Sequence, residues 1–312
     1  MAALGNYFLD APTLSGATAV FTDSTLTTPS PDGYYSDGNV VRQQLGGLLL
    51  AGSSDCPSCA FPCSQGISTD STQGIYDIDF SVGTDIGAVI IYFNPLASPD
   101  GLRVLYDSNT YNEMTSETQG YLASTDPNSF TYVGLKAEDC GIGVTLNGGG
   151  YSGLQEYDWN ASTGVFDNVG ASGVVTGTSA DVQITATSPD WCTLYFPKTA
   201  ATPETGLAQI FSPCDDAIWE IEINCPVVLV PVQGSIYSGL LNCEEGRLDT
   251  LYYNVPNRGG TAGDPRLNEF FCLDQYGINR APANDYSIEV GGVRKRITVD
   301  ANGVIIAIGP CT

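Results

Sequence analysis

Residues 23–35 (DSTLTTPSPDGYY) and residues 274–286 (DQYGINRAPANDY) have the same length, begin with aspartate and end with tyrosine. The flanking sequence also corresponds, since each copy continues to a Val-Arg pair, a glycine turn with an apolar run, and a cysteine. These matched elements are Phe21, Val41-Arg42, Gly46-Gly47 and Cys56 in the first copy, and Phe271, Val293-Arg294, Asn302-Gly303 and Cys311 in the second. A fixed spacing that recurs in this way indicates an internal repeat. We therefore predict one small β module of about 50–60 residues at each end of the chain.

The C-terminal copy predicts a hairpin. Residues 293–299 (VRKRITV) alternate, residues 300–303 (DANG) supply a turn, and residues 303–309 return as a second strand. Cys311 would then hold the last strand down, and Cys272 of the same module is one candidate partner. Upstream, residues 6–8 (NYF) match residues 252–254 (YYN).

A larger region lies between the copies. Residues 86–93 (IGAVIIYF) are almost continuously apolar, which is typical of a strand buried on both faces. Residues 217–225 alternate between apolar and polar side chains, which is typical of a strand with one wet face. About eight such segments with turn signals between them favour a jelly-roll-like sandwich. We therefore expect an all-β, disulfide-capable fold, with a central antiparallel β-sandwich at 74–226 between similar β modules at 1–60 and 227–312.

The composition excludes several classes of function. With 11 basic and 35 acidic residues, the net charge is −24, and such a field repels nucleic-acid phosphates. Histidine is absent, which excludes Ser-His-Asp and Cys-His enzymes. No apolar run reaches 18 residues, so we expect no membrane insertion, and residues 1–13 carry no secretory signal pattern. We expect a protein that binds or holds others, without catalysis.

An even number of cysteines in a β-rich chain favours structural disulfides. We expect all ten to take part: Cys56, Cys59, Cys63, Cys140, Cys192, Cys214, Cys225, Cys243, Cys272 and Cys311. The cluster Cys56, Cys59 and Cys63 leaves two alternatives open. It could ligate zinc or an iron–sulfur cluster, or it could act as a redox pair.

Acidic and aromatic side chains supply further candidates. Aspartates near strand ends could bind Ca²⁺ at one end of a sandwich, although turn chemistry also explains them. They are Asp85, Asp100, Asp107, Asp126, Asp139, Asp215 and Asp216. Glu220 and Glu222 share a strand face and could form a glycosidase pair. Tyrosines that could contact sugars or proteins are Tyr34, Tyr35, Tyr151 and Tyr157.

Two parts of the chain resemble virion proteins of tailed phages that infect cyanobacteria, other marine bacteria and Bacteroidetes. The terminal pattern ATAVFTD (17–23), PDGYYSDG (31–38) and VR (41–42) resembles short modules of these proteins. The central block is similar to a domain that accompanies them, through residues 87–95, 99–107, 191–198 and 213–226. Residues 99–107 are also similar to jelly-roll domains attached to secreted proteases and adhesins. No catalytic residue comes with the resemblance.

The resemblance implies a virion structural protein of the tail, baseplate or fibre. Such a protein would be a homo-oligomer in contact with other virion proteins, and it could also attach to a glycan or protein of the host surface. Three alternatives remain open: a capsid decoration protein, a glycan-binding bacterial surface adhesin, and a secreted hydrolase that uses Glu220 and Glu222.

Overall fold

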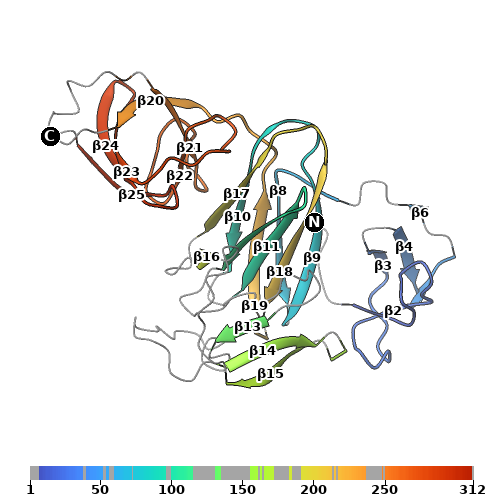
Figure 1. Ribbon diagram of the computed structural model, residues 1–312. Helices are drawn as coiled ribbons and strands as arrows, with labels where there is room; N and C mark the ends of the chain where they lie inside the picture. Colours follow the sequence, from blue (N-terminus) through green and yellow to red (C-terminus); the bar gives the residue numbers. More distant parts are fainter. Residues whose placement is uncertain are drawn as a thin grey trace. The chain divides into compact units, whose positions relative to one another are not determined.

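The regular structure of the described residues is β-strand, and the fold is all-β and β-sandwich-like, as the sequence predicts (Figure 1). The computed structural model describes residues 7–37, 40–51, 54–55, 60–71, 73–95, 100–114, 131–134, 155–160, 162–163, 165–171, 183–184, 191–212, 214–215, 217–236, 248 and 250–310. Within these ranges there is no helix of the length and hydropathy needed to cross a membrane.

The chain forms two compact units, which are described separately. The first comprises Met1–Ser81, Asn94–Asp190 and Thr205–Ile221, and the second comprises Val82–Phe93, Trp191–Glu204 and Glu222–Thr312. This grouping differs from the three domains inferred at 1–60, 74–226 and 227–312, and those boundaries stay a prediction.

The largest sheet of the first unit has six strands in the order β16-β12-β11-β18-β9-β7. Its strands are β7 (Phe61–Pro62), β9 (Gly74–Ser81), β11 (Gly101–Tyr106), β12 (Asn109–Met114), β16 (Gln183–Ile184) and β18 (Thr205–Ser212). Along β9, Tyr76, Ile78 and Phe80 are buried while Asp77 and Asp79 are exposed. One face of this sheet therefore packs into a core.

Other strands of the first unit are β8 (Gln65–Ser71) and the three-stranded sheet of β13 (Thr131–Gly134), β14 (Gln155–Asn160) and β15 (Val165–Ala171). β19 (Ala217–Ile223) runs from the first unit into the second. Phe166 of β15 packs against Phe211 of β18, with 6.5 Å between the ring centroids. The three-stranded sheet is thereby held to the six-stranded one.

The N-terminal module also belongs to the first unit. It contains the pair β1 (Phe8–Leu9) and β2 (Val20–Phe21), and a second sheet of β3 (Gly33–Ser36), β4 (Val40–Leu45), β5 (Leu48–Leu49) and β6 (Ser54–Asp55). The two sheets are joined by a hydrogen bond from the N–H of Leu49 to the carbonyl of Thr18, at 2.8 Å.

The C-terminal module, in the second unit, is a six-stranded sheet in the order β22-β21-β20-β23-β24-β25. Its strands are β20 (Pro231–Ile236), β21 (Thr250–Val255), β22 (Phe270–Cys272), β23 (Asn284–Val290), β24 (Val293–Val299) and β25 (Ile305–Pro310). A bridge between Phe270 and Val304 joins the two outer strands, so the sheet closes into a small barrel (Figure 1). The predicted hairpin of β24 and β25 is confirmed.

The second unit also contains β10 (Gly87–Asn94) and β17 (Cys192–Lys198), which pair antiparallel. β10 is buried along its whole length, as its apolar run predicts. A core forms between these strands and the C-terminal module. Its buried residues are Ala88, Ile90, Tyr92, Tyr195, Leu229, Val255, Phe270 and Cys272. The C-terminal module therefore packs onto β10 and β17 through this core.

Candidate functional site

Each small module contains a loop wrapped around one aspartate. Asp23 accepts hydrogen bonds from backbone N–H groups two, four and five residues later, at 3.0, 3.2 and 2.6 Å. Asp274 accepts them from the same three positions at 2.9, 3.0 and 2.6 Å. Leu26 and Gly277, at equivalent places, have positive φ angles of 57° and 73°. The predicted repeat is therefore present as one loop conformation built twice.

These loop carboxylates are used internally. The hydroxyl of Thr25 and the surrounding backbone N–H groups hold the pKa of Asp23 well below its usual range. A carboxylate surrounded by N–H donors has few oxygen lone pairs left for a cation, and calcium sites need several oxygen ligands. The role of Asp23 and Asp274 is consequently to shape the loop.

A tyrosine follows each loop, and its hydroxyl forms a hydrogen bond with a backbone carbonyl that precedes it. The Oη of Tyr35 donates to the carbonyl of Pro31 at 2.5 Å, and the Oη of Tyr286 donates to the carbonyl of Pro282 at 2.7 Å. Both acceptors lie four residues before the tyrosine. The Asp–Tyr spacing seen in the sequence thus corresponds to a loop of fixed conformation followed by this hydrogen bond. We call the hydrogen bond the tyrosine brace.

Strand register shows where the two interiors differ. Tyr35 on β3 pairs with Arg42 on β4, whereas Tyr286 on β23 pairs with Ile297 on β24. Arg42 therefore corresponds to Ile297, and its predicted match to Arg294 is wrong, because β23 and β24 form a longer hairpin than β3 and β4.

Arg42 is buried and acts as an internal donor. Its guanidinium donates to the backbone carbonyls of Leu14, Ala17 and Leu50, at 3.0, 2.5 and 2.8 Å. Two residues along β4, Gln44 is fully buried and bonds to both the N–H and the carbonyl of Val20, at 2.6 and 3.0 Å. Side chains therefore satisfy backbone groups in the interior of the N-terminal module.

The interior of the C-terminal module is aromatic instead. Tyr252, Phe271 and Tyr286 form a cluster of three rings, with centroids 5.1 to 5.3 Å apart. Ile297 and Val299 belong to the same buried core. They occupy the strand positions that Arg42 and Gln44 occupy in the N-terminal module.

The two modules differ most in one strand. In the C-terminal module β20 lies between β21 and β23 and pairs antiparallel with both. β1 and β3 are the counterparts of β21 and β23, and no strand of the described N-terminal residues lies between them. The described strands of the two modules therefore differ at the position of β20.

An aromatic pair recurs in the two modules. Phe8 pairs with Phe21 where Tyr253 pairs with Cys272, so Tyr7 corresponds to Tyr252, and the predicted match of residues 6–8 to residues 252–254 is shifted by one residue. Tyr7 and Tyr35 make an edge contact with centroids 5.2 Å apart, and the equivalent pair Tyr252 and Tyr286 makes one at the same distance. Tyr252 is only 3% exposed and Tyr286 only 1%, whereas Tyr7 is 42% exposed.

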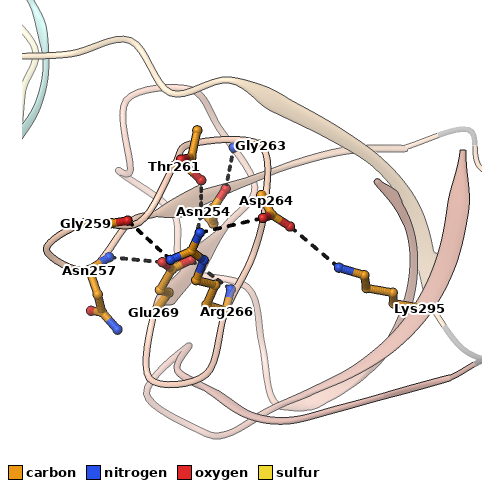
Figure 2. A network of polar contacts seen from close by, with 9 residues as sticks. All are labelled: Asn254, Asn257, Gly259, Thr261, Gly263, Asp264, Arg266, Glu269 and Lys295. Atoms are coloured by element: carbon orange, nitrogen blue, oxygen red, sulfur yellow. Dashed lines mark hydrogen bonds and ion pairs between the residues drawn. The ribbon is translucent and has the colours of Figure 1, made fainter. Parts of the chain in front are cut away.

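A second polar cluster organises the long loop between β21 and β22 (Figure 2). The buried Glu269 accepts from the side-chain amide of Asn254 at 2.7 Å and from the N–H groups of Asn257 and Arg266 at 3.1 and 3.0 Å. Asn254 in turn accepts from the N–H of Gly263 at 2.7 Å. Burial raises the pKa of Glu269, while these donors lower it in part. The cluster is saturated by its own loop, which is typical of a structural network.

Ion pairs at the rim of this loop extend the network outward. Asp264 contacts Arg266 at 3.9 Å and Lys295 of β24 at 3.6 Å, and Arg266 donates to the carbonyl of Gly259 at 3.3 Å (Figure 2). These partners are partly exposed, so each pair contributes little by itself.

Polar contacts also attach the C-terminal module to β10 and β17. The Oη of Tyr92 donates to the carbonyl of Pro256 at 3.1 Å, and Arg280 donates to the Oη of Tyr195 at 3.2 Å. The guanidinium of Arg280 also lies over the Phe270 ring, 4.3 Å from its centroid. The apolar core between module and strands is thus bordered by directional contacts.

The cysteine prediction is confirmed in part. Cys63, Cys214 and Cys225 are disulfide-bonded. Cys192 and Cys272 are thiols, so the expected disulfides at these two positions, including a Cys272–Cys311 bond, are wrong. Burial raises the pKa of Cys272 to about 11, which keeps it protonated. Cys56, Cys59, Cys140, Cys243 and Cys311 lie outside the described residues.

In the described part of the chain, the side chains predicted as metal ligands do not come together in one site. Cys63 is in a disulfide and therefore does not serve as a thiolate ligand with Cys56 and Cys59. No three His, Cys, Asp or Glu side chains gather there to hold a metal ion. Burial raises the pKa of Asp100 to about 8, so this acid is mostly protonated at neutral pH.

The other predicted calcium ligands are dispersed. Asp85 precedes β10, Asp107 lies in the turn between β11 and β12, and Asp215 accepts from Gln73 at 3.1 Å. Asp126, Asp139 and Asp216 lie outside the described residues.

The remaining sequence candidates have other partners or stay as predictions. Glu220 accepts from Asn94 at 3.3 Å, and Glu222 forms an ion pair with Arg258 at 3.3 Å. Tyr34 is 74% exposed, while Tyr35 serves as the brace. Tyr157 lies on β14 with no side chain described, and Tyr151 lies outside the described residues.

Sequence reasoning missed the buried polar residues Arg42, Gln44 and Glu269. A signal was present for the first two, since they occupy alternate positions of one strand and would share its inward face. Glu269 has no such pattern around it, because its partners come from a loop without regular periodicity.

Comparison with known proteins gives no relative. No family model, no curated protein and no solved structure matches the chain.

Proposed function

We propose that the chain is a structural protein of a tailed-phage virion, in the tail, baseplate or fibre, that works through protein–protein contacts of its β modules. The observation that carries the proposal is the duplicated module, built twice with the same aspartate loop and tyrosine brace. The described polar groups of these loops bond to the backbone of the module itself. This arrangement favours a holding or docking role over catalysis.

The packing of one module supports the same proposal. The C-terminal module shares a buried core with β10 and β17. A particle component benefits from such a joint, because its shape must persist once neighbours are bound. The sequence resemblance to phage virion modules is a second, separate support.

Immunogold labelling of purified particles, imaged in negative stain, tests the proposal. We expect label at the tail or its tip, in regular positions. Label spread over the capsid would overturn the tail position and favour a decoration protein. Absence of label from intact and mildly disrupted particles would overturn the virion role altogether.

A further inference from the structure

Arg258 presents a fork of hydrogen-bond donors at the surface of the second unit. Its Nε bonds to Glu222 at 3.3 Å, and its guanidinium lies over the Trp191 ring, 4.0 Å from the centroid. The side chain is 48% exposed, and its Nη1 and Nη2 groups make no hydrogen bond with the described residues. We propose that Arg258 and Glu222 bind a saccharide that carries a carboxylate, of the uronic-acid class.

The backbone that carries Arg258 is fixed before any ligand arrives. Arg258 belongs to the loop between β21 and β22 (Figure 2). Just before it, the carbonyl of Pro256 accepts from the Oη of Tyr92 at 3.1 Å, and Asn257 accepts from the hydroxyl of Thr193 at 2.8 Å. Burial raises the pKa of Tyr92 to about 12, so its hydroxyl stays protonated and remains a donor. The loop therefore holds Arg258 in one place relative to β10 and β17.

The guanidinium itself is held from two directions. Trp191 is half-buried and packs against the core between the C-terminal module and β10 and β17, so its ring is a firm support. Glu222 fixes the Nε edge of the same guanidinium. An arginine that is stacked and paired in this way loses little conformational freedom when its remaining donors bind a ligand. Nη1 and Nη2 of Arg258 are consequently a preorganised pair.

The geometry of this pair selects a carboxylate. The N–H groups of a planar guanidinium donate in parallel to the two oxygens of a carboxylate, and these charge-assisted bonds are stronger than neutral ones. A single hydroxyl or carbonyl oxygen satisfies only part of such a fork. The first feature of the ligand is therefore a carboxylate.

Glu222 specifies the second feature. It is 29% exposed, and only its Oε2 bonds to Arg258. A carboxylate is an acceptor only, so a ligand hydroxyl can donate to it, whereas a second carboxylate of the ligand would be repelled. The net charge of −24 likewise disfavours a ligand with several acidic groups. A sugar acid has one carboxylate and several hydroxyls on one rigid ring, which an acidic peptide lacks. The inference does not depend on a virion role.

The probe is methyl glucuronide, titrated into the full chain and followed by saturation-transfer NMR. Its matched control is methyl glucoside, which has the same ring with a hydroxymethyl group in place of the carboxylate. The glucuronide should bind at one site, about tenfold more tightly than the glucoside. The amide of acetyl-glutamate, which has the carboxylate without the hydroxyls, should also bind more weakly than the glucuronide.

Two variants of the chain locate the binding. Arg258→Lys keeps the charge but loses the planar fork and the stacking, and should weaken glucuronide binding about tenfold with an unchanged circular dichroism spectrum. Arg294→Lys is the matched control, because the Nε of Arg294 also pairs with a glutamate, Glu289, at 3.4 Å. It should leave glucuronide binding unchanged.

Lack of glucuronide binding, or equal affinity for the glucuronide and the glucoside, would overturn the proposal. Equal affinity of the wild-type chain and Arg258→Lys would overturn it as well, because the sugar would then bind elsewhere. Binding of the acetyl-glutamate amide that equals or exceeds that of the glucuronide would overturn the assignment to a saccharide and favour an acidic peptide.

Discussion

The N-terminal and C-terminal modules have the same loop and brace but different interiors. Asp23 and Asp274 bind the same three backbone positions, and the tyrosine brace is repeated four residues after a proline carbonyl. Arg42 nevertheless stands where the other copy has Ile297. Local hydrogen bonds therefore determine the path of the chain in both copies, while the side chains at the matched strand positions determine how apolar each interior is.

The difference has a physical reason. A closed barrel excludes water, so the C-terminal copy gains stability from burying rings and aliphatic side chains. In the N-terminal copy, side-chain hydrogen bonds to backbone groups take the place of part of this apolar packing. Arg42 and Gln44 provide these bonds.

Substitution of each interior residue by its counterpart in the other module should have the largest effect on the free energy of unfolding. Ile297→Arg places a charge in the closed barrel with no free acceptor, and should cost about 4 kcal/mol or more of unfolding free energy. Arg42→Ile leaves carbonyls without their donor and should cost about 2–3 kcal/mol. Urea unfolding followed by circular dichroism measures both, and a larger loss for Arg42→Ile would contradict the comparison.

Removal of the loop aspartates should have the next largest effect. Asp274→Ala leaves three backbone N–H groups without their carboxylate and should cost about 1–3 kcal/mol. Asp23→Ala should cost less, because water reaches its exposed loop more easily. Thermal unfolding measures the two variants beside Asp32→Ala as an exposed control. A loss no greater than that of the control would exclude the structural role of Asp274.

Protonation of Asp23 and protonation of Glu269 should affect stability in opposite directions. The lowered pKa of Asp23 means that its contribution is present above pH 3.8 and is lost as the pH falls below that value. The raised pKa of Glu269 means that the folded state binds the proton more tightly, so the C-terminal module gains stability as the pH falls toward 4.5.

Segment-resolved hydrogen exchange between pH 6 and 3 checks both directions. Exchange rates are first corrected for their intrinsic pH dependence. Glu269→Gln should remove the gain in the C-terminal module without altering the loss in the N-terminal one. A gain that persists in Glu269→Gln would assign it to another group.

The tyrosine braces should give the smallest effect. Tyr286→Phe and Tyr35→Phe each remove one hydroxyl-to-carbonyl hydrogen bond, which is worth about 1 kcal/mol. Denaturant titration of each variant should give a shift no larger than this and of similar size. A shift several times larger in Tyr35→Phe would mean that the brace stabilises more than its own loop.

The repeat could be predicted because its aspartate, proline and tyrosine act locally, so their spacing survives in the sequence. The all-β class and the hairpin of β24 and β25 could be predicted for a similar reason, from alternation and turn residues. The register of β4 relative to β3 could not be predicted. It depends on the length of the hairpin, and the turn residues show no pattern that fixes this length. As a result Arg42 was matched to Arg294 and not to Ile297.

The place of β20 between β21 and β23 could not be predicted from the sequence. β20 is separated from β21 by residues 237–249, and pairing over such a distance leaves no periodic trace. The thiols at Cys192 and Cys272 were missed for a related reason, since an even cysteine count says nothing about which sulfurs meet.

Native-state hydrogen exchange of the full chain tests most directly whether the two modules share a loop but differ in their interiors. β23 pairs with both β20 and β24 and has buried residues, whereas the residues of β3 are half-buried or exposed. We predict that amides of β3 exchange at least one hundredfold faster than those of β23. Equal protection of β3 and β23 would contradict the difference between the interiors.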